Sequence, residues 1–113
     1  VVGWGSTKGA IEEAVERVRA DGRKVSAMHL RFLQPMASGI KEVMQGFDKV
    51  ITVENSWADS LDDAIIDEEN RRYSGLAWLL RAKCLIDIDC WGEVGEQPIK
   101  PATVERVIRE RLR

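Results

Sequence analysis

The chain has 113 residues, of which 44% are hydrophobic and 32% charged, and its formal net charge is −2. This length and composition predict one compact globular domain, and no apolar run approaches the roughly 20 residues that a membrane-spanning helix needs. The weak negative charge and the scattered lysines and arginines argue against nucleic acid as a partner, because phosphate binding needs clustered positive charge.

The first predicted element is an apolar strand at residues 1–4, which leads through a glycine-bearing turn into a helix. Ser6 or Thr7 can cap that helix, and the pair Asp21-Gly22 is typical of its end. Its buried face is predicted from apolar residues at helical spacing, which are Ile11, Ala14, Val15 and Val18. Because an apolar strand needs neighbours on both sides, a chain that starts inside one is expected to be a fragment, with residues 1–113 forming a single domain.

Two further strands and one helix are expected before residue 55. Residues 24–33 have apolar side chains of both parities, which favours a strand covered on both faces and ended by Gln34-Pro35. The β-branched run at residues 50–53 is the clearest strand of the sequence. The helix between them has the apolar stripe Ile40, Val43, Met44 and Phe47.

The second half of the chain alternates in the same way. A helical stripe starts at residues 61–65, but the polar run at 67–72 has no apolar anchor, so we expect a solvated helix end or a loop. A helix at residues 76–80, a fourth strand at 84–88 and a turn-rich segment at 91–100 follow. Pro101 then stands just inside a last helix with the stripe Val104, Val107, Ile108 and Leu112.

This alternation predicts an α/β fold with a parallel sheet and helices on both faces, because parallel strands need right-handed crossovers of about a dozen residues. The first strand is then central, between the strands at 24–33 and 50–53, with the strand at 84–88 outermost. Ligands bind such sheets beyond the carboxyl ends of the strands, where the strand order reverses. The predicted crevice therefore lies between residues 5–7 and residues 54–56.

Candidate ligand-binding residues at this crevice are Gly5, Ser6, Thr7, Glu54 and Asn55. The turn at residues 5–9 places small residues and hydroxyls at a helix N-terminus, where free backbone N–H groups favour an anion. Its spacing fits neither a dinucleotide fingerprint nor a phosphate loop, so a tight turn that needs glycine for backbone fit is the alternative. Glu54 and Asn55 could contact a ligand or a neighbouring chain, or could serve as capping and turn residues. No catalytic residue and no metal site is assigned, because the sequence has no nucleophile with a base and no metal-ligand cluster.

His29, the two cysteines and two of the tryptophans are further residues of interest. His29 could act as an acid or base, but a lone histidine in an apolar strand is typical of a hydrogen-bonded core residue. Cys84 and Cys90 are expected to be buried and reduced, as in a cytoplasmic protein. The sequence has four tryptophans, of which Trp4 and Trp57 flank the crevice and mark either an interface with other protein or ordinary core packing.

Five motifs occur in a fixed order: VVGWGSTKGAI (1–11), HLRFLQP (29–35), VITVEN (50–55), SGLAWLLR (74–81) and GEQPIKP (95–101). This series, which covers nearly the whole chain, resembles the C-terminal domain of 2-oxoacid:ferredoxin oxidoreductase alpha subunits. Among these enzymes the similarity is greatest to the 2-oxoglutarate type.

The resemblance implies a three-layer α/β/α sandwich similar to the C-terminal domain of transketolase, with a mostly parallel sheet whose antiparallel strand would precede Val1. It also implies an enzyme that oxidatively decarboxylates a 2-oxoacid, transfers the acyl group to coenzyme A and reduces ferredoxin. Thiamine diphosphate, Mg²⁺ and iron–sulfur clusters would be bound by other domains of the alpha chain and by the beta subunit. This domain would then bind no cofactor itself, would be inactive in isolation, and would support the assembly and its interfaces.

The sequence departs from the family pattern at two places. Relatives often have Ser-Gly-Gln-Leu-Ala where this chain has Ser74-Gly75-Leu76-Ala77, and the acidic segment at residues 59–72 is longer than expected. Both departures leave the 2-oxoacid open. An alternative function from another class is a regulatory module that binds a small anion or a nucleotide at the turn of residues 5–9.

Overall fold

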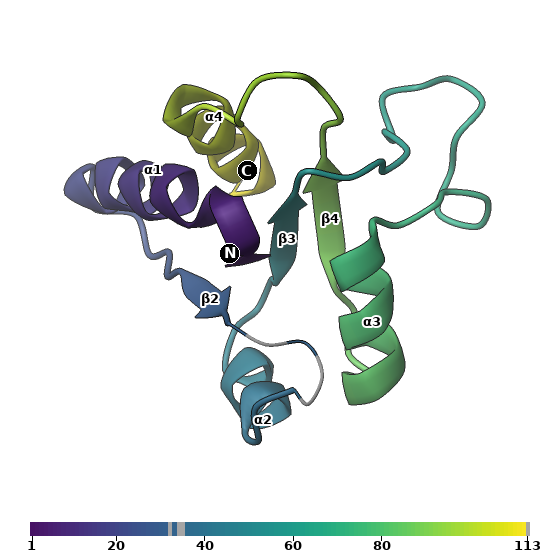
Figure 1. Ribbon diagram of the computed structural model, residues 1–113, viewed down its shortest axis with the longest axis horizontal. Coiled ribbons are helices and arrows are strands. Elements are labelled where there is room, and N and C mark those ends of the chain that lie inside the picture. The colour runs from purple at the N-terminus through teal and green to yellow at the C-terminus, as the bar shows by residue number, and fades with distance from the viewer. Residues whose placement is uncertain (32, 34–35, 113) are drawn as a thin grey trace.

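In the computed structural model, which describes residues 1–31, 33 and 36–112, strands and helices alternate along the chain as predicted (Figure 1). The elements are β1 (Val2–Trp4), the short 3-10 helix η1 (Gly5–Thr7), α1 (Lys8–Ala20), β2 (Met28–Leu30), α2 (Ile40–Gln45), β3 (Ile51–Glu54), α3 (Gly75–Cys84), β4 (Asp89–Gly92) and α4 (Pro101–Arg111). Gly22 follows α1 with a φ of 81°, and Pro101 opens α4, as the sequence predicts.

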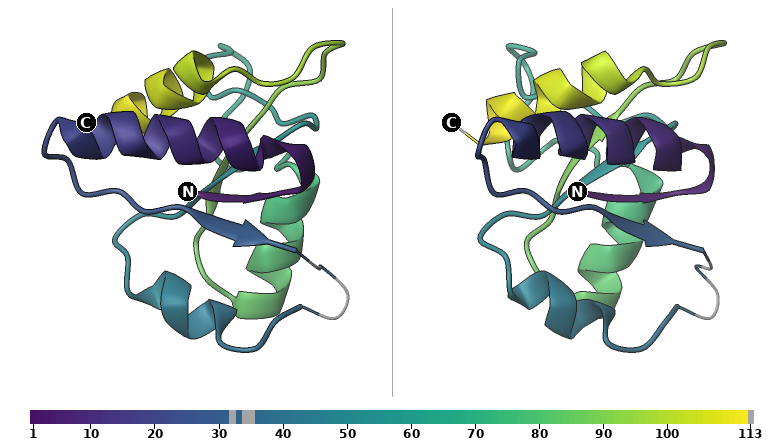
Figure 2. Two further views of the ribbon diagram at one scale, coloured as in Figure 1. Left: turned by 60° about the vertical axis from the view of Figure 1, so that its left-hand side comes forward. Right: turned by 90° about the vertical axis from the view of Figure 1, so that its left-hand side faces the viewer.

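Among the described residues, the strands form one four-stranded parallel sheet in the order β2-β1-β3-β4. The predicted strand order is therefore confirmed, with the first strand central and the fourth outermost beside β3. The register places Val2 opposite Thr52, and Thr52 opposite Cys90. Figure 2 shows α1 and α4 on one side of the sheet and α2 and α3 on the other, which is the expected three-layer α/β/α arrangement.

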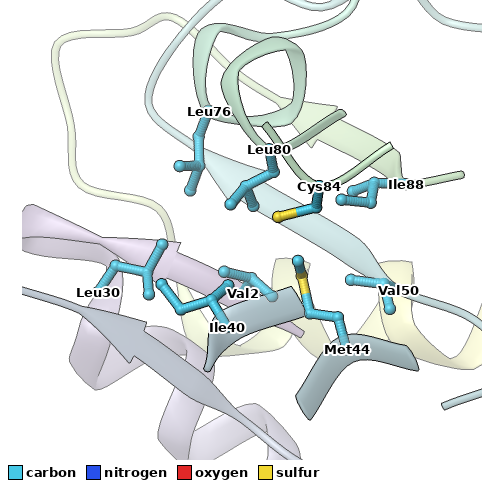
Figure 3. Close-up of a cluster of buried hydrophobic side chains, with 9 residues drawn as sticks. All are labelled: Val2, Leu30, Ile40, Met44, Val50, Leu76, Leu80, Cys84 and Ile88. Carbon is cyan, nitrogen blue, oxygen red and sulfur yellow. The ribbon is translucent and has the colours of Figure 1, made fainter. Parts of the chain in front are cut away.

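Each face of the sheet is covered by its own hydrophobic cluster. Under α2 and α3, the cluster comprises Val2, Leu30, Ile40, Met44, Val50, Leu76, Leu80, Cys84 and Ile88 (Figure 3). Under α1 and α4, it comprises Ile11, Ala14, Val15, Val18, Val53, Ile99, Val104 and Ile108. Because successive strand residues point to opposite faces, β3 sends Val53 to α1 and α4 while its two polar neighbours point to α3.

The fourth strand lies later in the chain than predicted. The apolar run at residues 84–88 was expected to form it, but Cys84 is the last residue of α3 and β4 begins at Asp89. Cys84 extends the buried helical stripe of Leu76 and Leu80 at i, i+4 spacing, so packing on the sheet keeps it helical. Leu85 then ends the helix in the left-handed region with a φ of 54°.

The segment at residues 61–65 forms turns in the structure, so the helical stripe predicted to start there is wrong. Its apolar side chains Leu61 and Ile65 are exposed, and no packing surface holds them in a helix. The strand predicted at residues 24–33 pairs with β1 only at Met28–Leu30, and Phe32 and Gln34-Pro35 lie outside the described residues.

Helix α2 buries only part of its predicted stripe. Ile40 and Met44 pack into the core, whereas Val43 and Phe47 are about half exposed. Across residues 1–31, 33 and 36–112, no helix has the length and apolar character required to cross a membrane.

Candidate functional site

The carboxyl ends of the neighbouring strands β1 and β3 open into a cleft of about 420 Å³, at the predicted switch point of the sheet. Gly5, Ser6, Glu54 and Asn55 line this cleft. Nδ2 of Asn55 donates a hydrogen bond of 2.9 Å to Oγ of Ser6, so the two predicted loops meet as expected. Trp4 also lines the cleft, and its ring is about half exposed.

The turn after β1 is shaped by backbone requirements. Gly5 has a φ of 66°, in the left-handed region that favours glycine. A Cβ on Gly3 would lie 2.3 Å from Cδ1 of Ile11, so only glycine lets β1 approach α1 this closely. Thr7 is buried, and its hydroxyl donates to the carbonyl oxygen of Trp4 at 3.1 Å, which turns it away from any ligand in the cleft. These contacts account for the glycine pattern as a tight strand-to-helix turn.

Glu54 is a buried carboxylate at the end of β3, with 3% of its surface exposed. Its Oε1 accepts the backbone N–H of Leu76 at 2.7 Å, and its Oε2 accepts that of Ala77 at 3.3 Å. The hydroxyl of Thr52 donates to Oε2 at 2.8 Å, and the hydroxyl of Ser74 donates to the same oxygen. Glu54 therefore holds the first turn of α3, where backbone N–H groups and the helix dipole favour negative charge.

This arrangement explains how α3 begins without a side-chain cap from its own N-cap residue. Ser74 is the N-cap, but its hydroxyl makes no hydrogen bond to the helix backbone. The carboxylate of Glu54, which comes from a strand twenty residues earlier, takes that place. The N-terminus of α3 therefore favours an anion at the carboxyl end of β3, and the carboxylate of Glu54 occupies that position.

A second polar group, centred on the buried guanidinium of Arg71, lies at β4. Arg71 donates to Oδ1 of Asp89 at 3.0 Å and to Sγ of Cys90 at 3.4 Å, and it stacks 4.4 Å from the ring centre of Tyr73. Arg111 donates to the other oxygen of Asp89 at 2.7 Å. Sequence reasoning missed this group, because its members are far apart in the chain and Arg71 stands in a charged run that is typical of a solvated surface.

The ion pair between Arg71 and Asp89 shifts the pKa values of both residues. Burial would raise the pKa of Asp89, but the backbone N–H of Cys90 and the two guanidinium groups lower it below the usual value. Burial would lower the pKa of Arg71, and its hydrogen bond to Asp89 raises it instead. Arg71 and Asp89 are therefore both ionised at neutral pH, and the contacts of Asp89 tie the loop before α3 to β4 and α4.

The structure tests the expectations for His29, the two cysteines and the two tryptophans. Cys84 and Cys90 are buried free thiols, as predicted, and they lie on α3 and β4. His29 lies on β2, and in the described part of the chain its buried Nδ1 has no hydrogen-bond partner, contrary to the satisfied core residue expected. Trp4 and Trp57 are exposed, so core packing is wrong for both.

The geometry supports binding and contact more than catalysis. Within residues 1–31, 33 and 36–112, no group of three or more His, Cys, Asp or Glu side chains is placed to hold a metal ion. The cleft offers a hydroxyl, an amide and an exposed indole, and its carboxylate is bound to α3. These groups can orient a polar ligand or contact another protein surface.

The known proteins to which this chain is similar include two oxidoreductase subunits. The chain is 31% identical over 112 residues to 2-oxoglutarate oxidoreductase subunit KorA of Mycobacterium tuberculosis, a match that covers 99% of this chain and 15% of that subunit. It is 42% identical over 60 residues to 2-oxoacid:ferredoxin oxidoreductase 1, subunit alpha, of Aeropyrum pernix, which covers 50% of this chain and 9% of that subunit. The chain thus spans a small part of the length of these relatives. No protein-family model and no solved structure matches it.

Proposed function

This chain is a homologue of part of the 2-oxoacid:ferredoxin oxidoreductase alpha subunits, and from that premise we propose that it is their C-terminal structural and interface domain. The whole protein would oxidatively decarboxylate a 2-oxoacid: carbon dioxide leaves, the acyl group passes to the thiol of coenzyme A, and the electrons released reduce ferredoxin. The domain would contribute to this reaction by holding the assembly together. Its partners would be the other domains of the alpha chain and the beta subunit.

The observation that carries this proposal is the similarity over 99% of the chain to a single oxidoreductase subunit. The site geometry agrees with a supporting role, because the buried carboxylate of Glu54 is bound to the start of α3 and not directed at a ligand. Thiamine diphosphate, Mg²⁺ and iron–sulfur clusters would be held elsewhere in the enzyme.

We further propose 2-oxoglutarate as the 2-oxoacid. The support is the similarity over 99% of the chain to the Mycobacterium tuberculosis relative, a 2-oxoglutarate oxidoreductase subunit. The Aeropyrum pernix relative has the broader name 2-oxoacid:ferredoxin oxidoreductase, so pyruvate and branched-chain 2-oxoacids are the competing substrates.

The test is an assay of the whole protein, produced anaerobically with its partner subunits. Coenzyme A-dependent reduction of a viologen dye is measured with 2-oxoglutarate, pyruvate and branched-chain 2-oxoacids in turn. We expect reduction with 2-oxoglutarate and none from residues 1–113 alone. Absence of reduction with every 2-oxoacid, in a preparation with thiamine diphosphate and intact clusters, would contradict the proposal.

The cleft of about 420 Å³ favours one alternative, a regulatory module that binds a small anion or nucleotide beside Ser6 and Asn55. Calorimetric titration with ATP, coenzyme A and inorganic phosphate would detect it. The alternative predicts micromolar binding that Ser6→Glu abolishes, because the new carboxylate repels the anion. Binding that Ser6→Glu leaves unchanged would place the ligand elsewhere.

A further inference from the structure

The connection between β3 and α3, residues 55–74, is a long loop that projects from the body of the molecule (Figure 1). We call it the acidic loop, because residues 59–72 contain six carboxylates and two arginines while the whole chain has a formal net charge of only −2. Its sequence also contains the apolar residues Trp57, Leu61 and Ile65.

The acidic loop is ordered by polar contacts. At its base, the guanidinium of Arg72 donates to both carboxylate oxygens of Asp59, at 3.1 and 3.2 Å, and the two residues also bond through their backbones. The indole N–H of Trp57 donates to Asp59 at 2.9 Å. Near its tip, Oδ1 of Asp67 accepts two backbone N–H groups at 2.8 and 2.9 Å. Hydrogen bonds from Arg72 hold the pKa of Asp59 well below its usual value, so the carboxylate at the base of the loop is ionised at any physiological pH.

Apolar side chains of this ordered loop face the solvent. The exposed fractions are 61% for Trp57, 44% for Leu61 and 78% for Ile65. Trp57 lies against the guanidinium of Arg72, 5.8 Å from its ring centre, while polar contacts hold the backbone around Leu61 and Ile65. A preformed segment that presents Leu, Ile and Trp loses little conformational freedom on binding, which favours its use as a contact surface.

The charge of the loop indicates what it contacts. Asp62 and Glu69 form no ion pair with any residue that the structure describes, and Asp63 and Asp67 accept backbone N–H groups. A metal ion is a poor candidate, because the described part of the chain has no group of acidic side chains placed to hold one. Charge complementarity instead favours a protein surface with lysines and arginines around an apolar depression.

We propose that the acidic loop docks on a partner subunit, with Leu61 and Ile65 inserted into an apolar depression and the surrounding carboxylates facing basic residues. This inference rests on the proposed function, in which the domain belongs to an assembly of subunits, and it identifies the surface that makes the contact. A second copy of the chain is the competing occupant, and self-association is one of the outcomes that the test distinguishes.

The experiment measures the association of the whole protein with its partner subunit, by biolayer interferometry at 50 and 300 mM NaCl. One variant combines Leu61→Ser with Ile65→Ser, and a second combines Asp62→Asn with Glu69→Gln. Val94→Ser is the matched control, since Val94 is an exposed apolar residue of another loop. All the substituted side chains are exposed or free of ion pairs, so the variants are expected to fold, and circular dichroism checks this.

We expect the serine variant to bind at least about tenfold more weakly at both salt concentrations, because it loses apolar burial. The asparagine and glutamine variant should bind more weakly than the wild type at 50 mM NaCl. At 300 mM the two affinities should be similar, because salt then screens the carboxylates through which the wild type gains affinity. Equal affinities for wild type and both variants, in a complex that retains 2-oxoacid-dependent viologen reduction, would overturn the docking inference and leave the proposed function intact. The docking inference would also be overturned if the wild-type protein bound no other subunit, or if it only paired with itself through this loop. The viologen assay would then show separately whether the proposed function fails.

Discussion

Replacement of Glu54 by glutamine should destabilise the start of α3 with little change of shape. The side chain is buried and accepts two backbone N–H groups of the helix and hydroxyl groups of neighbouring residues. Glutamine keeps one acceptor oxygen but places an NH₂ group against those donors, and it removes the negative charge from the helix N-terminus.

The magnitude follows from the contacts that are lost. A hydrogen bond to a charged group contributes about 1.5–3 kcal/mol, and a charge at a partly buried helix terminus contributes up to about 2 kcal/mol. Since one oxygen remains, we expect the free energy of unfolding to fall by about 2–4 kcal/mol. For a urea dependence of about 2 kcal/mol per molar, the unfolding midpoint should fall by about 1–2 M.

Two measurements check this prediction. Equilibrium unfolding of the chain in urea gives the free energy, and hydrogen exchange in the intact protein reports whether the amides of Leu76 and Ala77 lose protection. Glu12→Gln, at an exposed position of α1, is the control and should change stability by less than about 0.5 kcal/mol. If Glu54→Gln leaves both readouts at wild-type values but abolishes oxidoreductase activity, Glu54 has a chemical role and the structural reasoning is wrong.

Four further substitutions test other contacts. Gly92→Ala should destabilise the protein by about 1–3 kcal/mol or prevent folding, because its Cβ would lie 2.1 Å from the carbonyl oxygen of Ser56. In contrast, a Cβ on Gly9 would meet nothing within 4 Å, so Gly9→Ala should stabilise α1 by up to about 1 kcal/mol. Thermal unfolding of the two variants and the wild type measures both effects. Because the pKa of Asp89 is lowered in the folded state, its contribution to stability is present above about pH 4 and is lost as the pH falls through the folded-state pKa. The Asp89→Asn variant should therefore be less stable than the wild type at pH 7, and its stability should fall less steeply in acid. An unaltered acid limb would show that other carboxylates dominate acid unfolding. Arg71→Lys should lower the melting temperature by several degrees, since an ammonium cannot reproduce the stacked, forked contacts of this guanidinium; an unchanged melting temperature would show that charge alone suffices.

Local patterns predict most of this fold because its crossovers are regular. Hydrophobic stripes locate α1 and α4, and the β-branched run at residues 50–53 locates β3 to within one residue. Once the alternation is known, right-handed crossovers leave few strand orders, and the order with β1 at the centre is the one observed. The predicted crevice at the switch point follows from the same rule and coincides with a cleft.

The misses involve contacts between distant segments. Cys84 has the composition of a strand residue, and only the position of the sheet beneath α3 makes it the last turn of a helix. Asp89 is an unusual strand residue that is stabilised there by Arg71 and Arg111, which come from two other elements. No local pattern shows that Glu54 meets the N-terminus of a helix that starts twenty-one residues later, so its capping role remained one of two interpretations.

The paired Asp59 and Arg72 fix the two ends of a long connection at one place. Residues between them can therefore change in number without moving β3 or α3, since lengthening a closed segment is opposed only by chain entropy, about 0.6 kcal/mol for each doubling. This makes the connection a tolerant insertion site, where homologous chains can evolve different tips on a constant scaffold. A reporter peptide or a cleavage sequence grafted between residues 60 and 71 should leave the sheet undisturbed.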